Sequence, residues 1–301
     1  ILYIVVRKRG HMKYIDLHTH SNYSDGTCSP AEVVEKAVSN GLSAFALTDH
    51  DSVAGIDDAI NAVKKQNTPI QLIPGTELSV GYKSGDIHIV GLFINHHDAA
   101  FNKVSEMMIK RRINRNLEMV KRFNDAGIPI TMPELTNGNP DAVITRAHFA
   151  RWLVNHDVVK SPNDAFKKYL DTSSPFYVPR KYITPEEGID IINKSGGIAI
   201  LAHPLHYKLP QNELEQLIER LKDAGLKGIE VMYSNHIGQD EAYARKLANK
   251  YHLLPSGGSD FHGANKPAID IGKGRGNLAI PYEYLENLAA ECNIDLSDYN
   301  I

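Results

Sequence analysis

Short apolar runs alternate with amphipathic helical patterns at both ends of this chain, and that alternation restricts its fold more than any other feature of the sequence. A strand is expected at each apolar run, over 12–17, 42–48, 70–73, 87–94, 198–202, 228–232 and 253–254. Strands that alternate with helices usually pair in parallel and bury both faces of one sheet. The sequence therefore predicts an α/β fold, with parallel pairing among the first four strands.

Two of the helices begin with the same signal. Ser29 and Thr184 each precede a proline, and Glu32 and Glu187 follow three residues after them. This order predicts a capping box with proline at the first helical position. Each such helix returns the chain to the next strand, as an α/β fold requires.

The alternation breaks off in the middle of the chain. From about 98 to 180 the periodicity is helical, and no strong strand is evident. Helices are expected over about 107–126, 146–155 and 162–171. We therefore predict an inserted helical subdomain over 98–180, and an α/β unit formed by 12–97 and 181–301.

Strands separated by helices pack most naturally as a closed or distorted β/α barrel, with active groups at the carboxyl ends of the strands. An open doubly wound sheet is the competing architecture. No Gly-x-Gly-x-x-Gly pattern follows the first strand, which weakens the case for a dinucleotide site.

Composition disfavours several classes of function. The formal net charge is −3 and the pI is near 6.6, which argues against tight non-specific binding to long nucleic acid. Cys28 and Cys292 form no pair motif, so a reducing cytoplasm is the simplest setting. No run is long enough to span a membrane, and no obligate protein partner is evident. Two interpretations of residues 1–11 stay open: an extension before a start at Met12, and an additional edge strand.

Residues that can bind metal cluster where apolar runs stop. They are His18, His20, Asp25, His50, Glu77, His88, His203, Asp260 and His262. Imidazole and carboxylate donors suit zinc, manganese or iron, and the absence of thiolate argues against a structural zinc site. Each motif alone has an ordinary explanation, such as a helix cap or a turn. Their joint pattern predicts two or three divalent ions, with a carboxylate such as Glu77 free to bridge.

Seven short motifs, taken in order, resemble those of the PHP (polymerase and histidinol phosphatase) family. They are His18-Thr19-His20, Ser24-Asp25-Gly26, Leu47-Thr48-Asp49-His50-Asp51, Pro74-Gly75-Thr76-Glu77, Ile87-His88, Ala202-His203-Pro204 and Gly258-Ser259-Asp260-Phe261-His262. The resemblance implies a distorted (β/α)7 barrel of the TIM-like kind, a trinuclear metal site and phosphoesterase activity.

The same resemblance implies a ligand set for each metal. The first metal would be held by His18, His20, Glu77 and Asp260. Glu77 would bridge to a second metal that His88 and His203 complete. The third would be held by Asp25, His50 and His262.

The helical insert resembles one branch of the family, which acts on nucleotides. That branch includes nucleoside 3′,5′-bisphosphate phosphatases and 5′→3′ exoribonucleases of short RNA. The segments that carry this likeness are 144–150 and 176–182. The branch often has glycine and arginine after the His-Pro pair, whereas this chain has Leu205-His206-Tyr207. Because 144–150 and 176–182 resemble segments of that branch, the insert is expected to contribute to substrate binding.

Candidate substrate contacts are Arg146, His148, Arg180, Lys181, His206 and His236. Arginine can bind phosphate through paired hydrogen bonds and lysine as a point charge. A solvated position is an equal alternative for Lys181. The basic stretch Lys110-Arg111-Arg112 with Arg115 is interpreted as a solvated helix face.

The function expected from these features is hydrolysis of a nucleotide phosphomonoester by metal-activated hydroxide, with His203, Glu77 and Asp260 as the catalytic residues. Cleavage of short oligoribonucleotides and of histidinol phosphate are alternatives with the same chemistry. A metal-binding module without turnover, as in some polymerases, is a further alternative, and the complete ligand set argues against it. A metal-dependent amidohydrolase would use a different ligand layout.

Overall fold

The computed structural model describes residues 12–83, 85–136 and 139–300. The expectation of an extension or edge strand over 1–11 therefore lies outside the described residues. Within them, no helix is both long enough and apolar enough to cross a membrane.

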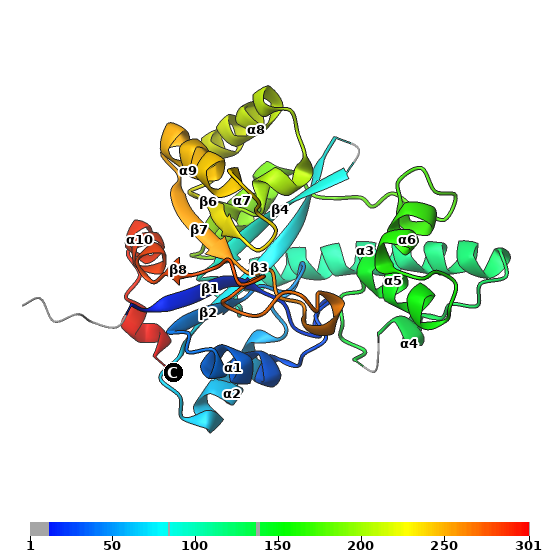
Figure 1. The fold of residues 1–301 in the computed structure, drawn as a ribbon, viewed down its shortest axis with the longest axis horizontal. Coiled ribbons are helices and arrows are strands. Elements are labelled where there is room, and N and C mark those ends of the chain that lie inside the picture. The colour runs from blue at the N-terminus through cyan, green and yellow to red at the C-terminus, as the bar shows by residue number, and fades with distance from the viewer. Residues whose placement is uncertain (1–11, 84, 137–138, 301) are drawn as a thin grey trace, which may run out of the picture.

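One sheet of eight strands forms the centre of the fold, in the order β7-β6-β5-β4-β3-β2-β1-β8 (Figure 1). The strands are β1 (Tyr14–Thr19), β2 (Ala44–Leu47), β3 (Gln71–Tyr82), β4 (Gly85–Leu92), β5 (Ile198–Leu201), β6 (Gly228–Tyr233), β7 (Leu254–Gly258) and β8 (Ile280–Pro281). The end of β1 meets the segment after β7, because His20 N–H donates to the Phe261 carbonyl at 3.0 Å. The sheet is thus a nearly closed barrel, which confirms the expected TIM-like α/β fold.

The fourth strand is antiparallel to both of its neighbours, so the prediction of parallel pairing was wrong for it. β3 and β4 form a long hairpin whose ladder runs from Gly75 opposite Leu92 to Tyr82 opposite Gly85. A parallel partner would need a crossover helix, and the two residues between these strands leave no room for one. The pairs β1–β2, β2–β3, β5–β6 and β6–β7 are parallel, and the short β8 is antiparallel to β1.

Helices cover the outside of the barrel, with α1 and α2 on one side and α8 and α9 on the other (Figure 1). The helices of this unit are α1 (Pro30–Ser39), α2 (Ile56–Gln66), α7 (Pro185–Lys194), α8 (Gln211–Asp223), α9 (Asp240–Tyr251) and α10 (Glu283–Glu291). Short 3-10 turns are η2 (Pro204–Tyr207), η3 (Gly263–Asn265) and η4 (Leu296–Tyr299). Both predicted capping boxes form, at Ser29 and at Thr184.

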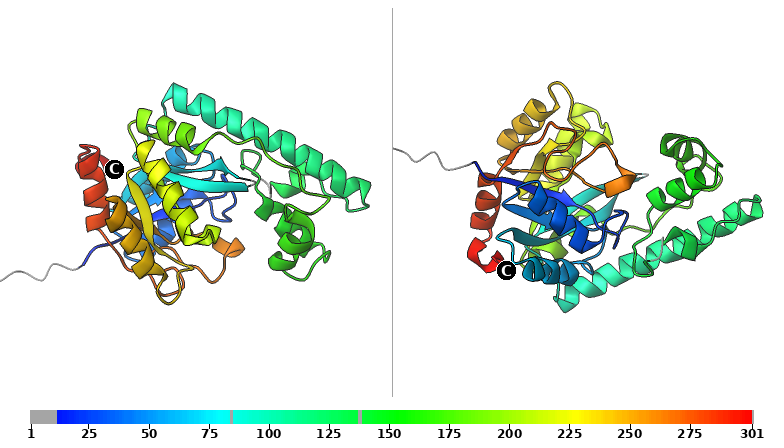
Figure 2. Two further views of the ribbon diagram at one scale, coloured as in Figure 1. Left: turned by 90° about the horizontal axis from the view of Figure 1, so that it is seen from above. Right: turned by 60° about the horizontal axis from the view of Figure 1, so that its bottom comes forward.

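The segment between β4 and α7 is helical. Its elements are α3 (Ala99–Asp125), α4 (Met132–Leu135), α5 (Arg146–Asn155), α6 (Pro162–Ala165) and the π-helical turn η1 (Phe166–Leu170). The 27-residue α3 starts against the barrel and extends beyond it, and α4, α5 and α6 lie beside its far half (Figures 1 and 2). There Phe123, Phe149 and Trp152 are buried in an apolar cluster separate from those of the barrel. Phe176 stacks on Phe123 with ring centroids 4.5 Å apart.

Candidate metal centre and substrate cavity

The nine residues expected to bind metal, here called the metal-ligand group, converge at one end of the barrel. Their donor atoms form four overlapping groups, each with all atoms within 4.8 Å of one another. These groups are His20-Asp25-His50-His262, His18-Glu77-His203, His18-His20-Asp260 and His50-Glu77-His88. Parallel strands present their carboxyl ends at the same edge, which is why residues distant in sequence meet here.

Glu77 lies at the centre of these nine residues. His88 Nδ1 and His203 Nε2 lie 2.8 and 2.9 Å from its Oε1 atom. His50 Nδ1 lies 3.0 Å from its other oxygen, Oε2, and His20 Nε2 lies 3.3 Å from that atom. One carboxylate therefore faces imidazoles from several strands, as a bridging ligand would. Its place in the middle of β3 differs from the strand end expected from sequence, because pairing with β4 extends the strand to Tyr82.

Asp25 contacts a second set of side chains. Its Oδ1 atom lies 3.1 Å from His262 Nε2 and 3.6 Å from His50 Nε2. Its Oδ2 atom accepts a hydrogen bond from Thr145 Oγ1 at 2.8 Å. Because Thr145 caps α5, this bond attaches the insert directly to the metal-ligand group.

Asp260 and His203 occupy strained backbone positions. Their φ angles are +55° and +29°, in the region that residues with a side chain seldom adopt. Asp260 Oδ2 accepts from Tyr233 Oη at 2.8 Å and from Lys266 Nζ at 2.6 Å. Its Oδ1 faces His20 Nε2 at 3.4 Å. Backbone strain of this kind persists where surrounding contacts hold a functional side chain in place.

Several of the donor atoms are buried without a hydrogen-bond partner among the described residues. They are His18 Nε2, His20 Nε2, Asp25 Oδ1, His50 Nδ1 and His203 Nδ1. A buried polar atom left unpaired costs about 1–3 kcal/mol. Divalent cations would satisfy the atoms that face the centre, and imidazole with carboxylate is a suitable donor set for zinc, manganese or iron. The residues therefore fit a group of divalent metal ions.

The carboxylates and imidazoles of this centre shift one another's pKa values. Burial opposes ionisation of Glu77, but the imidazoles of His88 and His18 outweigh it and hold the pKa of its carboxyl well below the ordinary value. Burial likewise opposes protonation of His88, yet Glu77 and Asp86 raise the pKa of its imidazole to about 10. The negative charge that draws a proton to His88 would equally attract a divalent cation.

Glu230, in β6, was not anticipated from the sequence. It is 1% exposed, its Oε1 lies 2.8 Å from His18 Nδ1, and its Oε2 accepts the His203 backbone N–H at 2.7 Å. The sequence feature that could have identified it is a single acidic residue inside an apolar strand, at Ile229-Glu230-Val231. Its carboxylate orients two of the histidines from behind.

Asp49 is a second supporting carboxylate that sequence reasoning treated only as part of a motif. Its two oxygens accept from Ser21 N–H at 2.8 Å, Ser21 Oγ at 2.6 Å and Ser24 Oγ at 2.6 Å. Burial raises the pKa of Asp49 in spite of these bonds. The contacts hold the loop that carries Asp25 against the end of β2.

A cavity of about 850 Å³ opens in front of these ligands, between the barrel and the insert. On the barrel side it is lined by Asp25, His50, Glu77, His88, His203, His206, Asp260, His262 and Lys266. On the insert side it is lined by Arg112, Arg115, Thr145, Arg146, Arg151, Val154, Phe166 and Arg180. Cationic side chains thus face the metal-ligand group across the cavity.

Arg112 and Arg115 are buried in this wall, so their interpretation as a solvated helix face was wrong. Their exposed fractions are 6% and 8%. The first half of α3 packs on the barrel, as the bond from Ser105 Oγ to the Asp51 carbonyl at 2.6 Å shows. Burial, together with Arg112 and Arg180, lowers the pKa of Arg115 to about 9, so the guanidinium still carries its charge at neutral pH.

Asp51 organises two of the arginines. Its Oδ2 accepts from Arg112 Nε at 2.6 Å and from an Arg180 guanidinium nitrogen at 3.0 Å. Its Oδ1 accepts the Ser79 backbone N–H at 2.7 Å. Burial raises the pKa of Asp51, and the two arginines outweigh it so that the net shift is downward. This carboxylate joins the end of β2 to α3 and to the last residue of the insert.

The six candidate substrate contacts separate into two groups. Arg146, Arg180 and His206 line the cavity. His148, Lys181 and His236 are absent from its lining. His148 is buried behind Thr145, whose backbone N–H donates to its Nδ1 at 3.0 Å, and Lys181 is exposed to solvent.

An apolar strip lies beside the arginines on the insert wall. Ala147, Ala150 and Val154 come from one face of α5, and Pro162 and Phe166 continue the strip along α6 and η1. Phe166 is 39% exposed, although an aromatic ring gains from burial. The cavity therefore offers an aromatic face in addition to positive charge.

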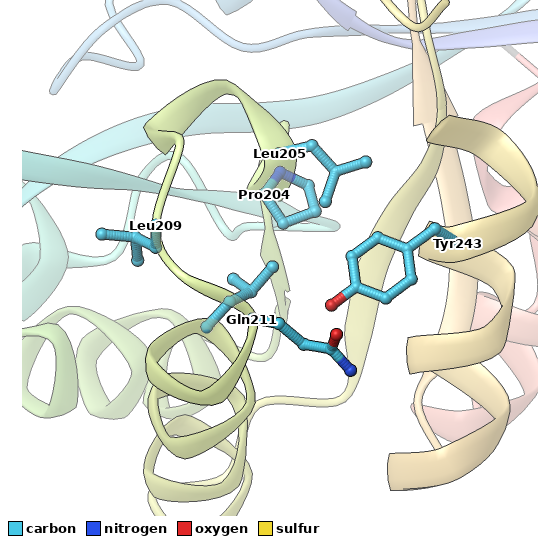
Figure 3. Close-up of a pocket in the computed structure, with 6 residues that line it drawn as sticks. Pro204, Leu205, Leu209, Gln211 and Tyr243 are labelled. Atoms are coloured by element: carbon cyan, nitrogen blue, oxygen red, sulfur yellow. The ribbon is translucent and has the colours of Figure 1, made fainter. Parts of the chain in front are cut away.

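A smaller cavity of about 360 Å³ lies behind the turn that follows His203 (Figure 3). Tyr243 from α9 points across it toward Gln211 at the start of α8. Its remaining lining is apolar, from Pro204, Leu205, Leu209 and Leu214. This lining contains no histidine, carboxylate or cysteine, so the chemistry belongs to the larger cavity.

Comparisons with known proteins agree with this geometry. The 5′-3′ exoribonuclease Rnm of Salmonella typhimurium is 36% identical over 86% of this chain and 88% of its own length. The 3′,5′-nucleoside bisphosphate phosphatase of Chromobacterium violaceum is 34% identical over 87% of this chain and 91% of its own length.

Solved structures show the same fold. A Chromobacterium violaceum protein described as an amidohydrolase, with bound sulfate and no metal, superposes with a TM-score of 0.82. It is 33% identical, and the match covers 92% of this chain and 96% of that one. The profile of the PHP domain matches residues 16–177. With the barrel, the convergent histidines and carboxylates and these relatives in agreement, the chain belongs to the PHP domain family.

Proposed function

We propose that this protein is a metal-dependent phosphatase that hydrolyses a phosphomonoester of a nucleotide, of the AMP or nucleoside 3′,5′-bisphosphate type. One observation carries the proposal: a single cavity has the Glu77-centred ligand group on one wall and arginines with an apolar strip on the other. A nucleotide offers a phosphate, further negative charge and an aromatic base, and this cavity has a counterpart for each.

Two or three divalent ions, of manganese, zinc or iron, would be held in the sets expected from the sequence. The ligands would be His18, His20, Asp25, His50, Glu77, His88, His203, Asp260 and His262. When bound, such ions supply activated water and neutralise charge on the phosphoryl oxygens. Activity is expected to depend most on Glu77, His203 and Asp260. Glu77 faces five of the histidines, and the backbone of His203 and Asp260 is held at positive φ.

The chain's own residues position the substrate. Arg146 and Arg180 line the cavity and would bind phosphate oxygens through charge-assisted hydrogen bonds. Arg112 and Arg115 add positive charge in a largely buried setting, where it is screened less than on the surface. The relative of known structure that holds sulfate, a tetrahedral anion like phosphate, is consistent with an anion site in this fold.

We assign 98–180 as an inserted subdomain that contributes to substrate binding, within a barrel formed by 12–97 and 181–301. Two observations support the division: the insert has its own apolar cluster, and its α5 and η1 supply one wall of the cavity. We also place the protein in the cytoplasm, because Cys28 and Cys292 are both free thiols.

Cleavage of short RNA from its 5′ end is the second candidate function. It is favoured by the relative named as a 5′-3′ exoribonuclease, which matches nearly the whole chain. Both functions use the same ligand group, so only the product distinguishes them.

The test is an incubation of the manganese-loaded protein with four substrates: adenosine 3′,5′-bisphosphate, AMP, histidinol phosphate and a short 5′-phosphorylated RNA. We expect inorganic phosphate from a nucleotide. Mononucleotides released from RNA with no phosphate from nucleotides would favour the exonuclease. Selective cleavage of histidinol phosphate would contradict a nucleotide substrate, and no turnover at all with bound metal would contradict the phosphatase. The Glu77→Gln variant is the control for contaminating phosphatases.

A further inference from the structure

Outside the cavity, three side chains with metal-binding atoms converge where the insert begins. Asp57 lies in the first turn of α2, and His96 and His97 lie in the loop that joins β4 to α3. The Nε2 atoms of His96 and His97 lie 3.0 and 3.6 Å from the same oxygen, Asp57 Oδ1. The three donor atoms all lie within 4.8 Å of one another. Adjacent side chains in an extended segment point to opposite sides, so this convergence requires a particular loop conformation.

Hydrogen bonds hold that loop conformation. Asn95 Oδ1 accepts the His97 backbone N–H at 3.2 Å, and Asn102 Nδ2 donates to the His96 carbonyl at 3.0 Å. The Asn95 backbone N–H donates to the Ser195 carbonyl at 3.1 Å, which fixes the loop to the end of α7. The donor atoms are thus arranged before any ligand arrives, which lowers the entropic cost of binding.

The surroundings of the three side chains admit a cation from solvent. The side chains of His97 and Asp57 are 70% and 59% exposed, whereas that of His96 is 14% exposed. The amino end of α2 carries a partial positive charge, which disfavours a cation. The full negative charges of Asp57 and Asp58, both in that first turn, exceed this partial charge.

We propose that Asp57, His96 and His97 form a peripheral site for a borderline divalent cation such as Zn²⁺, separate from the cavity. Two imidazoles and one carboxylate suit zinc, nickel or copper, whereas magnesium and calcium prefer oxygen ligands alone. Three protein ligands leave one position for water in a tetrahedral arrangement. The ion would join α2 to the start of α3, the helix that carries Arg112 and Arg115 into the cavity wall.

Residue-resolved protection of the histidines tests this site. The manganese-loaded protein is exposed to diethyl pyrocarbonate with and without added Zn²⁺, and the modification of His96 and His97 is quantified by mass spectrometry. We expect Zn²⁺ to suppress modification of both residues and to raise the melting temperature, because an ion that binds only the folded state stabilises it. Glu35→Ala, an exposed carboxylate on α1, is the matched control and should behave as the wild type does.

Two variants test which side chains bind the ion. In Asp57→Ala, Zn²⁺ should protect His97 much less and shift the melting temperature less. In His96→Ala, Zn²⁺ should no longer protect His97. Equal modification of His97 with and without Zn²⁺ in the wild type would overturn the site. Undiminished protection in both variants would show that other atoms bind the ion. Because His96 and His97 are read out individually, neither result depends on the metals or the activity of the cavity.

Discussion

Nδ1 of His18 lies 2.8 Å from Oε1 of Glu230, and this contact decides which nitrogen of His18 faces the other ligands. An ionised carboxylate accepts a hydrogen bond, so Nδ1 carries the hydrogen and Nε2 keeps its lone pair. Nε2 lies 3.3 Å from Glu77 Oε1, on the side where the ligand groups overlap. Glu230 therefore holds His18 with Nε2 directed at the proposed metal centre.

Replacing this carboxylate should weaken metal binding. In Glu230→Gln the amide group cannot accept from both His18 and the His203 backbone, so at least one histidine loses its orientation. We expect a metal affinity about 10–100-fold lower, the range seen when such supporting partners are removed. Metal content at controlled free Mn²⁺ measures the effect, with Glu219→Gln on the surface of α8 as control. An unchanged affinity would mean that the barrel alone holds the two imidazoles.

Glu77→Gln should have a larger effect. The substitution removes the negative charge that faces His88, His203 and His50, so the protein should lose at least one equivalent of metal. Phosphatase activity should fall by roughly 100-fold or more. Metal analysis and kinetics are compared with those of Glu106→Gln, and circular dichroism checks the fold. Full activity with full metal content would reject a bridging role for Glu77.

Arg115→Gln should raise KM with little change in kcat. The Nε atom of Arg115 has no hydrogen-bond partner within the described part of the chain, so its charge is available to a phosphate. Charge-assisted hydrogen bonds contribute about 1.5–3 kcal/mol, which corresponds to a KM roughly 10–100-fold higher. Steady-state kinetics with adenosine 3′,5′-bisphosphate provide the measurement. Lys110→Gln, an exposed residue of the same helix, should leave KM unchanged.

Phe166→Ala should raise KM for substrates that carry a base and leave KM for other substrates almost unchanged. A base stacked on the exposed ring would contribute about 1–3 kcal/mol, so KM for a nucleotide should rise. KM for ribose 5-phosphate, which lacks a base, should change little. Leu117→Ala removes another exposed apolar side chain, on α3, and serves as control. An equal rise for both substrates would show that the ring stabilises the insert and does not recognise the base.

The stability of the protein should depend on pH through His148. Burial lowers the pKa of this imidazole to about 4 from the ordinary 6.5. Between these values the unfolded chain binds more protons than the native protein, so the free energy of unfolding falls as pH drops from 6.5 toward 4. The loss from this residue is about 3 kcal/mol.

His148→Gln isolates that contribution. Glutamine can accept the Thr145 N–H and keep the capping box, but it does not titrate. In urea unfolding between pH 4 and pH 7, the free energy of unfolding of the wild type should fall by about 3 kcal/mol more than that of the variant as pH drops from 6.5 to 4. Above pH 6.5 the difference between the two proteins should stay constant. A pH-independent difference between the two proteins would contradict the depressed pKa of His148.

Local sequence signals were sufficient for seven of the eight strands and for the choice of metal-ligand candidates, whereas the short β8 and α4 were not expected. The helix starts at Ser29 and Thr184 depend on residues three positions apart, so a short stretch of sequence determines them. Candidate ligands such as His18, His20 and His203 follow apolar runs, and the barrel brings the ends of those runs together. The pattern of motifs also identified the PHP family before any contact was known.

Tertiary packing decided the rest. The local period of α3 marks Arg112 and Arg115 as polar positions, but only the approach of the barrel buries them and brings Asp51 to Arg112. Glu230 is one acidic residue in an apolar strand until β6 places it behind His18. β4 is antiparallel because it forms a hairpin with β3. The apolar pattern of β4 alone does not indicate which strand it pairs with. Backbone conformation is set by neighbours in sequence, whereas burial and charge pairing are set by whichever element packs against a residue.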